Sequence, residues 1–80
     1  MENDNQVIGE FTKNKSEKVV GLLSKYMGNR NAALQVWYET REGEWKPTGK
    51  TVSINVRLLE KEIEVLQQIK KQAESLGWLP

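Results

Sequence analysis

Residues 41–51, REGEWKPTGKT, come closest to a chemical motif, because they end in the Gly-Lys-Thr of a nucleotide-binding loop. A phosphate-binding loop has the spacing G-x-x-x-x-G-K-[S/T], in which the first glycine lets backbone amides wrap around a phosphate. Five positions before Gly49 stands Glu44, and Gly43 lies one residue too far away. The motif must also run directly into a helix, whereas residues 51–54, TVSI, have the composition of a strand. We therefore expect no nucleotide hydrolysis here.

The same segment fits a solvated hairpin connection, in which Pro47 fixes a bend and Gly49 permits a positive φ. This interpretation leaves Trp45 unexplained, because a large aromatic side chain in a charged segment either packs under the loop or meets a ligand. Lys46 and Lys50 lie on either side of it and favour the ligand.

Histidine and cysteine are both absent from the 80 residues. The chain thus lacks the commonest general base, the commonest metal ligand and any thiolate or disulfide. We expect no enzyme, no metal site and no cofactor. The polar, acidic start of the chain and the lack of an apolar run of roughly 20 residues predict a soluble, intracellular protein without a membrane segment.

Strand-like composition marks four segments before residue 55, and helical periodicity follows them. The predicted strands are residues 6–11, 18–27, 33–40 and 51–54. From Val56, apolar residues recur at steps of three and four, which predicts an amphipathic helix of about twenty residues. Asn55 is its expected N-cap, Gly77 suits the C′ position, and Trp78 is expected to fold back as the apolar contact after it. The pattern predicts a two-layer α+β domain in the order ββββα.

The size of the chain predicts self-association. A domain of 80 residues buries only about 60% of the surface of its unfolded chain, so its core is marginal. The apolar stripe of the helix is broader than one thin sheet needs, which favours a homodimer. The expected interface residues are Leu59, Ile63, Leu66 and Ile69. We expect residues 1–5 to be disordered and residues 6–80 to form one domain.

Positive charge and aromatic residues coincide in the middle of the chain. Residues 18–55 carry a surplus of +3, whereas residues 1–17 carry −2 and residues 56–80 are neutral. Cations neutralise a nucleic-acid backbone, and flat rings stack on unpaired bases. The mixture favours a single strand, although three tryptophans are also compatible with the core of a small domain.

The run LQVWYETREGEWKPTGKTVSI, residues 34–54, followed by Asn55 and a long helix, resembles the single-stranded-DNA-binding core of the positive cofactor 4 family of transcriptional coactivators. That family has a G-E-x-K-P loop, a lysine and an I-S-L strand leading into a helix. Residues 43–47, Lys50 and residues 52–54 match these parts in order, and the resemblance extends over about residues 18–75.

The resemblance implies an antiparallel, curved four-stranded sheet with one C-terminal helix, dimeric, with basic channels for single strands. Tyr26 occupies the position at which the family has an aromatic residue before the hairpin turn. Arg30 occupies the position of a lysine just after that turn. Trp37 and Tyr38 lie where the family has an arginine and an aromatic residue. Residue chemistry and the resemblance together give the expected nucleic-acid-binding residues: Lys25, Tyr26, Arg30, Trp37, Tyr38, Arg41, Trp45, Lys46 and Lys50.

Two departures from the family are visible. Gly49 stands where family members often have another cation, and the family's long Ser- and Lys-rich N-terminal region is missing. This points to a compact bacterial or phage-type relative, in the cytoplasm of a bacterial or phage-infected cell.

The sequence thus predicts a homodimer that binds single-stranded DNA largely independently of sequence, in transcription, replication or recombination. RNA and unwound duplex are alternative ligands. The alternative function is a protein–protein interaction module, or a transcription regulator without direct single-strand binding.

Overall fold

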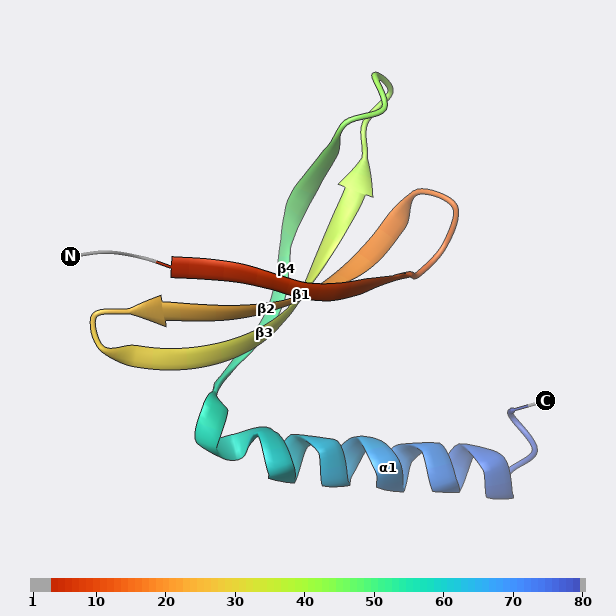
Figure 1. The fold of residues 1–80 in the computed structure, drawn as a ribbon. Coiled ribbons are helices and arrows are strands. Elements are labelled where there is room, and N and C mark those ends of the chain that lie inside the picture. The colour runs from red at the N-terminus through yellow and green to blue at the C-terminus, as the bar shows by residue number, and fades with distance from the viewer. Residues whose placement is uncertain (1–3, 80) are drawn as a thin grey trace.

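The computed structural model describes residues 4–79, which form one antiparallel sheet followed by a helix (Figure 1). The strands pair in sequence order, so β1 and β4 are the two edges. The elements are β1 (Asp4–Thr12), β2 (Glu17–Tyr26), β3 (Asn29–Glu39), β4 (Trp45–Asn55), a 3-10 turn η1 (Val56–Leu58) and α1 (Leu59–Ser75). The predicted ββββα order and fold class are confirmed.

The elements are longer than the sequence predicted at three places. β3 begins at Asn29, four residues before the predicted start, because the hairpin turn is only two residues long. β4 already begins at Trp45, so residues 45–50 are part of an edge strand, although we expected an irregular connection up to residue 50. Asp4 and Asn5 belong to β1, whereas residues 1–3 of the segment expected to be disordered lie outside the described residues.

Three short turns connect the strands. Met27 and Gly28 have φ angles of 51° and 84°, the pair of positive values that a two-residue type I′ hairpin needs. Between β1 and β2, the side chain of Asn14 accepts a hydrogen bond from the Ser16 amide at 3.0 Å. Between β3 and β4, the Thr40 amide donates to the Glu44 carbonyl at 2.7 Å. Such tight turns fix which residues of adjacent strands lie opposite each other.

The register divides the sheet into two faces. Residues that line the grooves next to α1 define the helix side, namely Gly21, Leu23, Ala32, Leu34 and Ile54. Their neighbours along each strand define the open face, which includes Lys18, Val20, Asn31, Gln35, Trp37, Thr51 and Ser53. Apart from η1, α1 is the only element outside the sheet in residues 4–79, and it lies on the helix side (Figure 1). The open face is therefore uncovered in this part of the chain.

An irregularity interrupts the pairing of β3 with β4. Gln35 lies opposite Thr51 and Trp37 opposite Pro47, so three residues of β4 face one residue of β3. Gly49 has a φ of 92° at this point. Proline and a left-handed glycine are tolerated because β4 is an edge strand with one free side.

The helical segment starts after Asn55 as predicted, but residues 56–58 form the 3-10 turn η1, and the α-helix itself begins only at Leu59, with Leu58 at its N-cap position. The Asn55 side chain accepts a hydrogen bond from the Arg57 amide at 3.0 Å and so caps η1, which leads into α1. At the other end Gly77 has a φ of 74°, and the Trp78 amide donates to the Ala73 carbonyl at 2.9 Å. The Trp78 side chain does not fold back as expected, because it is 75% exposed.

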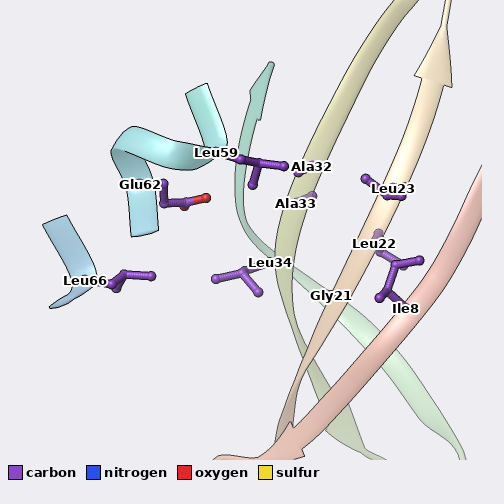
Figure 2. Close-up of a pocket in the computed structure, with 10 residues that line it drawn as sticks. All are labelled: Ile8, Gly21, Leu22, Leu23, Ala32, Ala33, Leu34, Leu59, Glu62 and Leu66. Carbon is purple, nitrogen blue, oxygen red and sulfur yellow. The ribbon is translucent and has the colours of Figure 1, made fainter. Parts of the chain in front are cut away.

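The chain has almost no core of its own. Val20 is the only buried apolar residue among those described, and it is 3% exposed. The accessible surface is 6733 Å², whereas a compact monomer of 9.2 kDa exposes about 4,900 Å². Figure 2 shows why: Leu59, Glu62 and Leu66 of α1 face Leu34 across an apolar groove of about 340 Å³ that remains open.

Candidate nucleic-acid interface

The predicted binding residues form two groups at opposite ends of the β2–β3 hairpin. The tip group comprises Lys25, Tyr26 and Arg30; the far group comprises Trp37, Tyr38, Arg41, Trp45, Lys46 and Lys50. Trp37 lies seven positions after Arg30 on β3, which is about 23 Å along an extended strand.

The tip group places two neighbouring cations on the helix side and an exposed ring on the open face. Lys25 and Arg30 are direct partners in the β2–β3 register, and Asp4 of β1 is the backbone partner on the other side of Lys25. Like charges directly opposite on neighbouring strands repel each other, and an anion between them would relieve this repulsion. Tyr26 is 51% exposed and lies opposite Asn29. The two cations can therefore attract a phosphate on the helix side of the tip, whereas the Tyr26 ring lies on the open face.

The far group carries both sheet tryptophans on the open face. Trp37 lies opposite Lys18 on β2 and opposite Pro47 on β4. Its indole Nε1 donates a hydrogen bond to Oε1 of Gln35 at 2.8 Å, which fixes the ring on the sheet. The two tryptophan side chains are half-buried, so part of each ring remains accessible.

Lys18 is an open-face residue that sequence reasoning did not assign to the site. Its ammonium nitrogen lies 4.7 Å from the centroid of the Trp45 ring, within the range of a cation–π interaction. The same nitrogen lies 3.3 Å from each carboxylate oxygen of Glu10 on β1. No sequence signal could have found this contact, since it depends on the register of three strands.

The remaining far-group residues do not lie with the tryptophans. Tyr38 and Lys46 are register partners on the helix side, and the Tyr38 side chain is 40% exposed. Arg41 is exposed in the β3–β4 turn, and Lys50 is exposed at the irregularity of β4. Trp37 and Tyr38, which the sequence could not separate, therefore point to opposite faces.

An acidic residue borders the far group at the β1–β2 turn. Glu17 lies opposite Tyr38, and its carboxylate accepts hydrogen bonds from Asn14 at 2.8 Å and from Lys13 at 3.2 Å. These bonds, the one from Asn14 first, hold the pKa of Glu17 below its ordinary value, with a smaller contribution from the charge of Lys50. Glu17 is thus ionised at neutral pH.

The predicted dimer residues form an exposed apolar stripe on α1. Leu59 is half-buried against the groove, whereas Ile63, Leu66 and Ile69 are 45%, 51% and 60% exposed. Residues 4–79 contain no cluster of carboxylates that could hold a metal ion, and no helix within them has the length and apolarity to cross a membrane.

Comparison with known proteins identifies the fold. No protein-family model matches the chain, and no curated protein matches its sequence. A solved structure of BPSL1147, a PC4 homologue from Burkholderia pseudomallei K96243, is 23% identical with a TM-score of 0.76 over 82% of this chain and 89% of that chain. A second crystal form of BPSL1147 gives 22% identity and the same TM-score over 84% and 98%.

A phage protein extends the comparison over more of the chain. The bacteriophage T5 homologue of the eukaryotic transcription coactivator PC4, implicated in recombination-dependent DNA replication, is 27% identical with a TM-score of 0.51 over 92% of this chain and 97% of that chain. The chain is PC4-like. These comparisons confirm the resemblance of residues 34–54 to the positive cofactor 4 (PC4) family. The open four-stranded sheet followed by one helix is the fold that this chain shares with the PC4 homologues.

Proposed function

We propose that this PC4-like protein is a homodimer that binds single-stranded DNA largely without sequence preference. The observation that carries the proposal is the uncovered open face, on which Trp37 and Trp45 present half-exposed rings among polar residues. Stacking on aromatic side chains is tolerant of sequence because every base has a π-face.

The open face suits bases better than it suits a protein partner. Besides the tryptophans and the apolar residues Val20, Leu22 and Ala33, it carries polar or amide side chains, including Asn31, Gln35, Thr51 and Ser53. A protein-binding face of this size would carry a larger apolar centre. The apolar side chains of this protein are instead concentrated on the helix side and on α1.

Cations at both ends of the β2–β3 hairpin supply the backbone contacts. Lys25 and Arg30 lie on the helix side of the tip, while Arg41 is exposed in the β3–β4 turn and Lys50 at the irregularity of β4. The spacing of about 23 Å along β3 lets one strand contact both groups through several nucleotides. Neutralised phosphates make the affinity fall with rising salt concentration.

The homodimer is supported by the exposed area. The surplus over a compact monomer is about 1,800 Å² per protomer, within the range that obligate dimers bury. The helix side and the stripe of α1 carry this surplus as apolar side chains. Because they lie away from the open face, association leaves the tryptophans accessible.

The biological process is proposed from the relatives alone. The T5 homologue is implicated in recombination-dependent DNA replication, and an activity on single strands in replication or recombination would suit a compact protein of the same fold. We propose the bacterial or phage-infected cytoplasm as its location. RNA and unwound duplex are ligands that the same stacking chemistry admits.

The proposal is tested by titrating the protein with single- and double-stranded oligonucleotides at two salt concentrations. Trp37→Leu and Trp45→Leu are each expected to weaken binding to oligo-dT by about 5- to 150-fold, the loss of one stacked base. Trp78→Leu is the matched control, because this tryptophan is 75% exposed at the helix end and distant from the open face. Equal affinity for duplex, or affinity indifferent to salt, would refute the proposal. Unchanged binding in the Trp37 and Trp45 variants would favour a protein-interaction module.

A further inference from the structure

Lys18 and Glu10 form a second feature of the open face that the proposed function does not yet explain. Their charged groups are 3.3 Å apart, and the Lys18 side chain is only 20% exposed while that of Glu10 is 51% exposed. The Lys18 ammonium also lies against the Trp45 ring at 4.7 Å. One cation is therefore shared between a carboxylate and a ring that is proposed to stack on a base.

We infer that Lys18 is a phosphate-binding subsite of the open face, which the carboxylate of Glu10 occupies in the free protein. The inference rests on the proposed function and adds a residue and a competitor to it. A backbone phosphate of the bound strand replaces Glu10 on Lys18 when the neighbouring base stacks on Trp45. Glu10 thereby weakens binding and holds the cation in position.

The position of Lys18 supports this assignment. It is the direct register partner of Trp37, and its ammonium contacts the Trp45 ring, so Lys18 neighbours both stacking positions. A nucleic-acid strand carries one phosphate for each base, and a cation beside two stacked bases is placed for the phosphate that joins them. The other cations of the far group lie elsewhere: Arg41 in the β3–β4 turn, Lys46 on the helix side and Lys50 at the irregular part of β4.

The position of Glu10 supports a competitor that can leave. It lies on the edge strand β1, opposite Val20, and half of its side chain is in solvent. A carboxylate and a phosphate oxygen make the same charge-assisted hydrogen bond to an ammonium group. Exposed ion pairs are weak, so Glu10 can move into water when a phosphate approaches.

A purely structural role predicts a different outcome. The Lys18–Glu10 pair also connects β1 to β2, and the stem of Lys18 lies beside buried Val20. If the pair only stabilised the sheet, removing the carboxylate would leave DNA affinity unchanged or lower it. If Glu10 competes with phosphate, removing it raises the affinity.

The test is a fluorescence-anisotropy titration of labelled oligo-dT with wild type, Glu10→Gln, Lys18→Gln, the double variant and Glu64→Gln. Glu64 is exposed on α1, so its substitution changes the net charge equally at a distance from the open face. We expect Glu10→Gln to tighten binding about three- to tenfold relative to Glu64→Gln. Lys18→Gln should weaken binding and reduce the salt slope by about one.

The double variant decides between local competition and general charge. In the Lys18→Gln background, Glu10→Gln should tighten binding no more than Glu64→Gln does. An equal gain with and without Lys18, or no gain in Glu10→Gln, overturns the inference while the proposed function stands. Failure of the wild type to bind oligo-dT overturns the proposed function itself. Circular dichroism shows whether Glu10→Gln folds. If it does not fold, Glu10→Asp replaces it, because the shorter side chain reaches Lys18 less well and should therefore tighten binding. Unchanged affinity of Glu10→Asp overturns the inference.

Discussion

The exposed stripe of α1 gives a quantitative test of the homodimer through Ile69→Ala. Ile69 is 60% exposed in the single chain. Complete burial of an isoleucine side chain contributes about 1.5–3 kcal/mol, so covering the exposed part contributes about 1–2 kcal/mol per protomer. A twofold dimer contains the residue twice, and the loss is about 2–4 kcal/mol per dimer. The dissociation constant should therefore rise by roughly 30- to 700-fold.

Sedimentation equilibrium over a range of protein concentrations measures this constant directly. Gln67→Ala is the matched control, because Gln67 is exposed on α1 about half a turn away from Ile69. This control should leave the dissociation constant unchanged within twofold, since it removes no apolar surface. The helical circular dichroism of both variants at high protein concentration shows whether the fold persists.

Two results would refute the reasoning. A wild-type protein that is monomeric at micromolar concentration would show that the exposed apolar stripe of α1 does not drive association. A dimer that Ile69→Ala and Gln67→Ala weaken equally would show that association uses another surface, such as the outer edge of β1, where Val7 and Phe11 are 60% and 61% exposed.

Three further substitutions test individual structural features. Met27→Asn should raise the free energy of unfolding by about 0.5–1 kcal/mol in urea titrations, because asparagine tolerates the positive φ of this position better than methionine does. Asn55→Ala should lower it by about 1 kcal/mol, since the Arg57 amide loses its cap. The lowered pKa of Glu17 stabilises the fold above its ordinary value of 4.5, and this contribution is lost as the pH falls through the lowered pKa. The difference in stability between wild type and Glu17→Gln should therefore be largest at neutral pH and shrink below pH 4.5, as thermal unfolding across the pH range would show.

The sequence predicted those parts of the fold that depend on local patterns. The helix follows from its apolar period, and its two ends follow from Asn55 and Gly77, whose roles require only neighbouring residues. The position of β4 was less predictable, because Pro47 and Gly49 interrupt the alternation that marks a strand. Only the topology makes β4 an edge strand, where such residues are tolerated.

The candidate site was predictable in composition and not in arrangement. Aromatic and basic residue types identify the middle of the chain, but the face on which each side chain lies depends on the register. Trp37 lies on the open face and Tyr38 on the helix side, although they are neighbours in the sequence. Lys18 was missed because its contacts with Trp45 and Glu10 join residues from three strands. The assignment of these residues to DNA binding stays a prediction.

The separation of the two surfaces has a thermodynamic consequence. With Val20 as the only buried apolar residue in the described chain, a single protomer has little to hold its sheet together, and association must supply the stability. Trp37, Trp45 and Lys18 lie on the opposite face from the apolar stripe, so base stacking on them does not compete with association. A ligand that binds only the folded dimer adds about 1.4 kcal/mol of apparent stability for each tenfold excess over its dissociation constant. The half-buried state of Trp37 and Trp45 fits this linkage, because side chains that are already partly packed lose little freedom when a base stacks on them.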